Sequence, residues 1–285
     1  MNVLSLFDGM SCGQIAVDRL GIKVENYYAS EIDKYAIKIA QKNYPNTIQL
    51  GDIKNVKGKD LPNIDLLLAG SPCQGFSFAG KQLAFDDPRS ALFFEFIRLL
   101  KEVKPKYFLL ENVRMKKEYL DAITDLVGVE PILINSALVS AQNRQRYYWT
   151  NLPVAGQPED KGLVLKDILE PSVTNFLSET TAMRSRTQRN VRDVADKANA
   201  LTATSYKGSQ SNGVTVVKGG NQEAKIAEYG ERWRVLTPLE CERLQTVPDN
   251  YTEGVSNTQR YKMLGNGWTV DVICHILKGV DYGSN

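Results

Sequence analysis

The sequence predicts an α/β fold in which a mostly parallel sheet is wrapped by helices around a Rossmann-like core. Over residues 1–150, short apolar runs alternate with stretches of helical periodicity, and this strand–helix–strand spacing is typical of a parallel sheet. Residues 155–230 are instead rich in Gly, Ser, Thr, Asn and Gln and have weak periodicity. We therefore expect an α/β core over 1–153, a small irregular region over 154–232, and a C-terminal segment over 233–285 that returns to the core.

Each element follows from its own apolar pattern. Buried apolar runs predict strands at 2–7, 24–30, 64–69, 107–110, 132–139 and 147–150. Apolar residues that recur at helical spacing predict helices at 14–20, 32–39, 92–103, 119–127, 238–246 and 270–277. Pro105 follows the helix at 92–103 and ends it.

Composition excludes several classes of protein. Hydrophobic residues make up 42% of the chain and charged residues 24%, which is the usual balance of a globular protein with a full core. The sequence contains no run of eighteen apolar residues, so we expect no membrane-spanning helix. The four cysteines form no C-x-x-C pair and His275 is the single histidine, so we expect no metal, no disulfide framework and a cytoplasmic setting.

The first two predicted strands lead into residues that suit a nucleoside cofactor. Gly9 and Gly13 allow a tight turn and a close approach of the backbone to a ligand. Glu31 follows the second strand, where an acid commonly accepts the hydroxyls of a ribose. Asp52 and Ile53 stand before the third strand and are well placed to contact an adenine. This pattern alone does not separate NAD from S-adenosylmethionine.

A proline–cysteine pair follows the third predicted strand. Pro72 fixes its own φ and restricts Ser71, so the thiol of Cys73 is aimed in a set direction at the strand's carboxyl end. A buried structural cysteine is the bland alternative, but the polar, glycine-rich flank argues against it. We expect Cys73 to be a nucleophile.

A carboxylate and two arginines follow on later strands. Glu111 ends the fourth predicted strand, at the same sheet edge as Cys73. Arg144 and Arg146 are two residues apart and so share one face of an extended chain. A thiolate that adds to C6 of cytosine makes C5 nucleophilic, and a carboxylic acid near N3 assists by donating a proton. The set therefore predicts methyl transfer to C5 of cytosine.

These motifs, in this order, resemble those of the DNA (cytosine-5-)methyltransferases. The resemblance covers nearly the whole chain except about 155–230. It is carried by Phe7-x-Gly9, Glu31, Asp52-Ile53, Pro72-Cys73-Gln74, Glu111-Asn112-Val113, Gln142-x-Arg144-x-Arg146, Arg234-Val-Leu-Thr-Pro-x-Glu240, Arg243-Leu-Gln245 and Leu264-Gly265-Asn266. The opening LSLFDGMSCG is most similar to the de novo animal enzymes, whereas the compact length is typical of bacterial or phage enzymes. Ser11 and Cys12 stand where bacterial members usually carry a further glycine.

The resemblance implies a Rossmann-like methyltransferase fold that uses S-adenosylmethionine and releases S-adenosylhomocysteine. It implies that Cys73 is the nucleophile, that Glu111 contacts N3, and that Arg144 and Arg146 position the carboxylate and the base. The cofactor contacts implied are Phe7, Asp8, Gly9, Met10, Ser11, Cys12, Glu31, Ile32, Asp52, Ile53, Pro72, Asn266, Gly267 and Trp268.

Duplex DNA is the expected partner, and the target cytosine must leave the helix before a thiol can reach C6. Residues 74–89 resemble the family's mobile catalytic loop. The resemblance makes 1–153 the catalytic and cofactor-binding core and 154–232 a small target-recognition region. In support of the second, residues 180–235 carry ten basic and five acidic side chains. The candidate DNA contacts are Gln74, Ser77, Lys81, Arg89, Arg184, Arg186, Arg189 and Arg192, for which a solvated surface is the bland alternative.

Three other functions compete with this interpretation. A tRNA cytosine-5 methyltransferase on the same fold usually carries a Cys-Phe-Thr sequence, which is absent here. An inactive DNA-binding homologue would lack Cys73 or Glu111, and both are present. A Rossmann enzyme acting on a small molecule would not need the basic insert. We expect a monomeric bacterial or phage protein. A cognate restriction endonuclease, where one exists, is expected to act as a separate protein.

Overall fold

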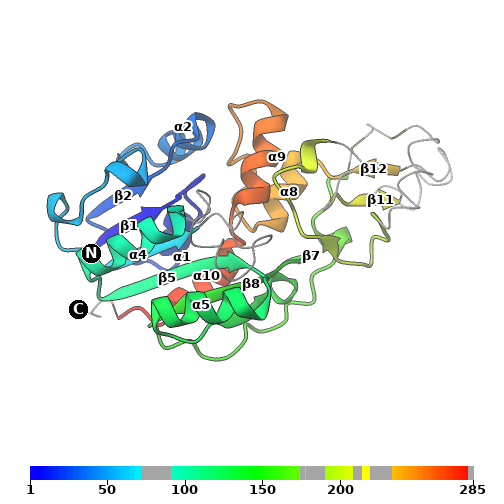
Figure 1. The fold of residues 1–285 in the computed structure, drawn as a ribbon. Helices are drawn as coiled ribbons and strands as arrows, with labels where there is room; N and C mark the ends of the chain where they lie inside the picture. The colour runs from blue at the N-terminus through cyan, green and yellow to red at the C-terminus, as the bar shows by residue number, and fades with distance from the viewer. Residues whose placement is uncertain are drawn as a thin grey trace. The chain divides into compact units, whose positions relative to one another are not determined.

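The computed structural model describes residues 1–71, 91–171, 173, 177, 190–207, 214–218 and 233–281. The chain divides into two compact units (Figure 1). Unit 1 consists of Met1–Ile134, Gln145–Gln157 and Ile273–Asn285, and unit 2 of Asn135–Arg144 and Pro158–Val272. Each unit is therefore assembled from segments that are far apart in the sequence. The three-part division expected from the sequence, at 153 and 232, stays a prediction.

Unit 1 is built on a seven-stranded sheet in the order β3-β2-β1-β4-β5-β8-β6. The strands are β1 (Asn2–Leu6), β2 (Asn26–Ser30), β3 (Ile48–Gln49), β4 (Leu66–Gly70), β5 (Tyr107–Val113), β6 (Ile132–Asn135) and β8 (Gln145–Thr150). β1 pairs in parallel with β2 and β4, and β5 pairs in parallel with β4. The strand order reverses between β1 and β4. At such a switch point, open α/β sheets bind ligands beyond the carboxyl ends of the strands.

Helices complete unit 1, and their apolar faces form its core with the sheet. They are α1 (Cys12–Arg19), α2 (Lys34–Asn43), α4 (Ala91–Val103) and α5 (Lys117–Val127), with the 3-10 helices η1 (Ile53–Asn55) and η2 (Gly58–Asp60). From α4, Phe93 and Phe96 are fully buried in a cluster that also contains Leu67 and Trp149. In the described part of the chain, no helix has the length and apolarity that a membrane span requires.

The α/β fold is as predicted, but three details of the sheet differ. β8 runs antiparallel to β5, because residues 136–144 are too few for the crossover that a parallel return needs. The strand expected over 132–139 ends at Asn135 and continues as the 3-10 helix η3 (Ser136–Leu138). The short strand β3 was not predicted, because two residues carry no readable alternation.

Unit 2 contains two small sheets and short helices. Strand β7 (Gln142–Asn143) pairs with β10 (Ala198–Asn199), and β12 (Trp233–Val235), β11 (Val216–Lys218) and β9 (Val191–Arg192) form a second sheet. Its helical elements are η4 (Leu165–Asp167), η5 (Ser205–Lys207), α8 (Pro238–Leu244) and α9 (Asn257–Asn266), and α10 (Val270–Leu277) starts in this unit. α8 begins at a capping box between Thr237 and Glu240. α9 was not predicted, since its sequence has little apolar periodicity.

Candidate active site

The loop after β1 lies at the switch point of the sheet and has an unusual backbone. Phe7, Gly9 and Ser11 have positive φ angles of 56°, 58° and 66°, a region that non-glycine residues rarely adopt. No atom lies within 4 Å of where a Cβ of Gly9 would stand. The backbone beside Gly9 is therefore open, as a loop that contacts a ligand requires.

The carboxylate of Glu31 holds this loop. Its Oε2 accepts a hydrogen bond from the Gly9 amide at 2.8 Å, and its Oε1 accepts from the amides of Ile32 and Asp33 at 2.7 and 2.8 Å. A carboxylate has about four acceptor positions, so capacity remains for a further donor such as a ribose hydroxyl. Beside it, the side chain of Ile32 is 74% exposed, which offers an apolar surface next to the carboxylate.

Asp52 and Ile53 lie next to the end of β2. The Ser30 hydroxyl donates to the carbonyl of Gly51 at 2.7 Å. Asp52 caps η1, since its Oδ1 accepts from the Lys54 amide at 3.0 Å. Ile53 is buried. The two segments predicted to contact the nucleoside thus meet at one edge of unit 1.

Asp8 is a titratable group inside the loop after β1. Its carboxylate accepts from the hydroxyls of Tyr27, at 3.0 Å, and Ser11. Burial raises the pKa of Asp8 to about 6, although hydrogen bonds from Ser11 and Tyr27 act in the opposite direction, and the charge of Glu31 raises it further. The loop therefore contains a carboxyl group that changes charge near neutral pH.

Glu111 and Arg146 meet on neighbouring strands. In the sheet register, Glu111 is paired with Gly70 of β4, three residues before Cys73, and with Tyr148 of β8. The Nε of Arg146 lies 3.0 Å from Oε1 of Glu111, with side chains 15% and 10% exposed. An ion pair between side chains with so little exposure is screened less than a surface pair, so it favours one orientation of the carboxylate.

Asn112 holds the strand end that leads toward the predicted nucleophile. Its Nδ2 donates to the Ser71 hydroxyl at 3.3 Å, and both residues are buried. Its Oδ1 accepts from the Val113 amide at 2.8 Å. The sequence analysis included Asn112 only as part of the Glu111-Asn112-Val113 motif and assigned it no role. Of the predicted site residues, Pro72, Cys73, Gln74, Ser77, Lys81 and Arg89 lie outside the described residues.

Arg144 has partners different from those of Arg146. It lies in unit 2, is 3% exposed, and donates to the carbonyls of Leu201 at 2.7 Å, Gly265 at 3.2 Å and Gly267 at 2.9 Å. Arg144 thereby joins the chain at Leu201 to the end of α9. Because Arg144 and Arg146 are two residues apart, we expected them to share one face and to act together. Their partners differ, because Arg144 lies between β7 and β8 whereas Arg146 lies within β8.

A buried polar network surrounds the predicted cofactor residues of unit 2. Gln245 donates to the carbonyls of Leu264 at 2.6 Å and Gly267 at 3.0 Å, and accepts from the Thr269 hydroxyl at 2.9 Å. Gln142 donates to Gln245 at 3.0 Å. The sequence analysis did not identify Thr269. Its position as a polar residue directly before an apolar helix was the signal that could have indicated it. Of the neighbouring predicted residues, Asn266 is exposed and Trp268 is buried.

Gly265 lies where two backbones nearly touch. A Cβ at this position would stand 2.1 Å from the carbonyl carbon of Thr202 and 2.4 Å from the amide nitrogen of Ala203. Because both neighbours are backbone atoms, neither can turn aside. The glycine of the Leu-Gly-Asn motif therefore allows the chain at Thr202 to pack on α9.

The predicted DNA-contacting arginines are described in part. Arg184, Arg186 and Arg189 lie outside the described residues. The guanidinium of Arg192 donates to the Val191 carbonyl at 2.8 Å and to Oδ1 of Asn199, and Asn199 donates to the Val214 carbonyl at 2.9 Å. These bonds make Arg192 part of the framework of unit 2, and its contact with DNA stays a prediction.

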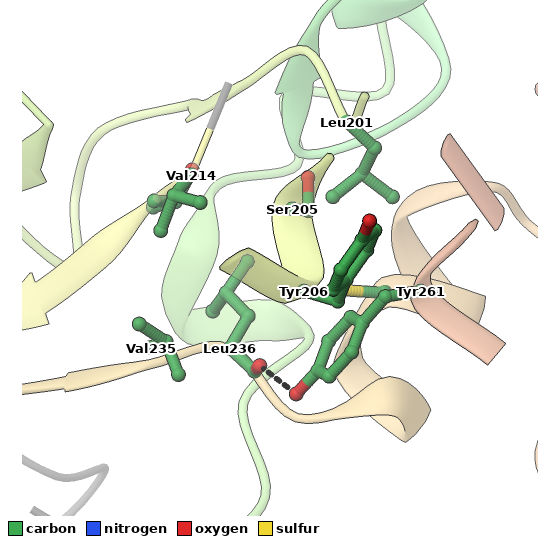
Figure 2. Close-up of a pocket in the computed structure, with 9 residues that line it drawn as sticks. Leu201, Ser205, Tyr206, Val214, Val235, Leu236 and Tyr261 are labelled. Carbon is green, nitrogen blue, oxygen red and sulfur yellow. Dashed lines mark hydrogen bonds between the residues drawn. The ribbon is translucent and has the colours of Figure 1, made fainter. Parts of the chain in front are cut away.

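Unit 2 also contains an apolar cavity of about 70 Å³ (Figure 2). It is lined by Leu201, Ser205, Tyr206, Val214, Thr215, Val235, Leu236, Cys241 and Tyr261. The Tyr261 hydroxyl donates to the Leu236 carbonyl at 2.8 Å (Figure 2). Burial raises the pKa of the Cys241 thiol far above its usual range, so this cysteine stays neutral. None of the lining residues was predicted as a site residue.

Comparison with known proteins matches almost the entire chain. The family model for C-5 cytosine-specific DNA methylases matches residues 1–281. The chain is 32% identical over 300 residues to the type II methyltransferase M1.ScrFI of Lactococcus lactis subsp. cremoris, covering 95% of this chain and 75% of the relative. It is 28% identical over 316 residues to the type II methyltransferase M.HhaI of Haemophilus parahaemolyticus, covering 100% of this chain and 95% of the relative.

Among solved structures, the fold is similar to that of a Spodoptera frugiperda DNMT2 mutant. The TM-score is 0.77, the sequences are 24% identical, and the similarity covers 97% of this chain and 98% of that one. At this identity the likeness concerns the fold.

Proposed function

We propose a mechanism from the family to which the chain belongs, that of the C-5 cytosine-specific DNA methylases. In this proposal the reaction proceeds through a covalent adduct between the Cys73 sulfur and C6 of a flipped-out cytosine. The enzyme is a DNA (cytosine-5-)-methyltransferase, which methylates C5 of cytosine in DNA with S-adenosylmethionine as the methyl donor. The residue roles below are part of the proposal.

The residues at the switch point fit an adenosyl cofactor. The loop after β1 is open beside Gly9, and Glu31 has acceptor capacity left for a ribose. The exposed Ile32 offers an apolar contact for the base, and Asp52 lies on the neighbouring segment. We propose that Phe7 stacks on the adenine. When bound, S-adenosylmethionine supplies the electrophilic methyl group that C5 accepts.

Cys73 and Glu111 divide the activation of the base. The Cys73 thiolate forms a bond to C6, and the electron pair of the C5–C6 double bond moves toward C5 and the ring. Glu111 donates a proton at N3 as negative charge develops there. Arg146 holds the Glu111 carboxyl group through the 3.0 Å contact. After C5 has gained the methyl group, a base removes the C5 proton, the C5–C6 double bond re-forms as the C6–S bond breaks, and the thiolate leaves. The proton on N3 returns to the Glu111 carboxylate, which gives neutral 5-methylcytosine.

The target cytosine must leave the helix for this chemistry. A stacked base does not expose C6, and methyltransferases that act on duplex DNA flip the base into a pocket. We propose that residues 74–89 close over the flipped base, with Lys81 and Arg89 contacting phosphates. We further propose that Arg184, Arg186 and Arg189 read bases or contact phosphates.

The observation that carries this mechanism is the pairing of Glu111 with Gly70 and Arg146. In support, the strand register pairs Glu111 with Gly70, which is three residues before Cys73 in the chain, and Arg146 forms an ion pair with the Glu111 carboxylate. The similarity to relatives named type II methyltransferases supports a restriction–modification role. The monomeric state and a separate endonuclease stay predictions.

The test is to trap the adduct on duplex DNA that contains 5-fluorocytosine. Fluorine at C5 prevents loss of a proton, so the protein should remain attached to the DNA in a denaturing gel, only when S-adenosylmethionine is present. The Cys73→Ala variant should not be trapped. A Cys73→Ala enzyme that methylates DNA at the wild-type rate would overturn the mechanism. Transfer of labelled methyl groups to tRNA but not to duplex DNA would instead identify a tRNA methyltransferase.

A further inference from the structure

One arginine on α4 holds the turn that carries two of the proposed adenine contacts. The Nη2 of Arg98 donates to the carbonyls of Val56 at 2.9 Å and Ile53 at 3.2 Å. These carbonyls lie at the two sides of η1, the three-residue 3-10 helix capped by Asp52. A single guanidinium therefore grips both ends of this turn.

Two carboxylates on the same helix fix the orientation of Arg98. Its Nε and Nη2 donate to Oε2 of Glu95 at 2.8 and 2.7 Å, and its Nη1 donates to Oε1 of Glu102 at 2.9 Å. The two hydrogens of Nη2 are thus shared among three acceptors, those of Glu95, Ile53 and Val56. The planar guanidinium presents its donors in a rigid fork. With the fork held on both sides by α4, the direction of the bonds to η1 is set by the helix.

Glu102 extends the same contact to the next turn. Its Oε2 accepts from the Gly58 amide at 2.7 Å. A Cβ on Gly58 would stand 2.6 Å from the Cβ of Glu102, so η2 and α4 approach as closely as glycine allows. The Gly58 amide and the Arg98 guanidinium lower the pKa of Glu102, which keeps the carboxylate charged and the contact intact at neutral pH.

We infer that Arg98 is a positioning residue for the adenine side of the cofactor site, acting through η1 on Asp52 and Ile53. The inference depends on the proposed function for the assignment of these two contacts. By itself η1 is held by few hydrogen bonds, from the Asn55 amide to the Asp52 carbonyl at 2.9 Å, from the Val56 amide to the Ile53 carbonyl at 3.1 Å and from the Lys54 amide to Oδ1 of Asp52 at 3.0 Å. Ile53 and Val56 also pack in the apolar core cluster, and Arg98 adds the polar contacts that hold both ends of the turn.

The residue that holds η1, Arg98, is on α4. This helix begins at Ala91, directly after the segment that contains Cys73. The element that follows the nucleophile in the chain thus also holds one side of the cofactor site. Substitution of Arg98 is therefore expected to weaken cofactor binding more than it lowers the catalytic rate at saturating cofactor.

Calorimetric titration with S-adenosylhomocysteine measures this directly on the full chain. Arg98→Met keeps the aliphatic stem and removes all donors, and we expect its Kd to rise about tenfold, equivalent to about 1.4 kcal/mol. Arg98→Lys should recover part of this loss, because one donor can still reach a carbonyl. In turnover assays with duplex DNA, Arg98→Met should raise KM for S-adenosylmethionine by a similar factor and change kcat little.

Arg243→Met is a matched control. Arg243 has a similar exposure, 30% against 33%, and it also bonds a carboxylate and a carbonyl, those of Asp249 and Ile168. Its partners are not proposed cofactor contacts. We expect Arg243→Met to lower the melting temperature without changing the Kd. If both methionine variants weaken binding equally, or if neither does, Arg98 has no positioning role.

A double-mutant cycle separates this inference from the proposed function. If Arg98 acts through η1, the losses from Arg98→Met and Asp52→Ala should be less than additive, since the second removes the contact that the first displaces. Additive losses would overturn the inference while leaving the cofactor site in place. If Asp52→Ala and Glu31→Ala both bind S-adenosylhomocysteine as the wild type does, the proposed cofactor site itself is wrong.

Discussion

Replacing Arg144 by methionine should affect mainly the stability of the protein, whereas replacing Arg146 should affect mainly its turnover. Arg144 makes three hydrogen bonds to buried backbone carbonyls of unit 2. Arg146 instead bonds the carboxylate proposed to act on the base. We expect Arg144→Met to lower the stability of the protein and Arg146→Met to lower its catalytic rate.

The contacts give the size of each effect. Hydrogen bonds from a charged donor contribute about 1.5–3 kcal/mol each and are not additive, so loss of the three made by Arg144 should cost about 3–5 kcal/mol. At about 2–4 °C per kcal/mol, the melting temperature should fall by about 6–20 °C. Arg146→Met instead removes one ion pair, between side chains that are 15% and 10% exposed. If this loss costs about 1.5–3 kcal/mol in the transition state, kcat should fall by about 10- to 150-fold.

The assays are thermal unfolding and single-turnover methylation of duplex DNA at saturating S-adenosylmethionine, below the melting temperature of both variants. Arg146→Lys, which keeps the charge but not the fork, should recover part of the rate. An Arg144→Met protein with the wild-type melting temperature and a rate as low as that of Arg146→Met would refute the reasoning. It would show that Arg144 acts on the base rather than on the carbonyls of unit 2.

Two further predictions concern Asp8 and Gly265. Asp8 has a folded-state pKa of about 6 against a usual value of 3.8, so its ionisation opposes folding. The stability that its protonated form contributes should be lost as pH rises from about 4 to 6. Urea unfolding of wild type and Asp8→Asn across this range should show the variant gaining relative stability, whereas a constant difference would contradict the shift. Gly265→Ala places a Cβ 2.1 Å from the Thr202 carbonyl carbon and should destabilise the protein by about 1–3 kcal/mol, measured by urea unfolding. An unchanged midpoint would mean that the two backbones separate at little cost.

Much of unit 1 was predictable from the sequence because its signals are local. An apolar run marks a buried strand wherever it occurs, as at β1, β4 and β5. The residues that follow such strands in a parallel sheet meet at one edge, which placed Glu31 and Glu111 at the candidate site before any contact was known. Unit 2 gave weaker signals, because strands of two or three residues and a polar helix such as α9 have no clear period.

The choice of partner depended on the tertiary structure. Arg144 and Arg146 are indistinguishable by type and spacing, yet one bonds carbonyls at the end of α9 and the other bonds Glu111 on β5. The antiparallel direction of β8 and its place beside β5 decide this, and neither is written in the local pattern. The same holds for Arg98, whose sequence context is an ordinary helix face, and for Gly265, whose close neighbour is Thr202. The sequence by itself determined which segments become strands and helices and which chemical groups the chain carries, because these depend on neighbouring residues. Only the tertiary structure decided which groups meet, because hydrogen bonds and close packing act between segments that are distant in the chain.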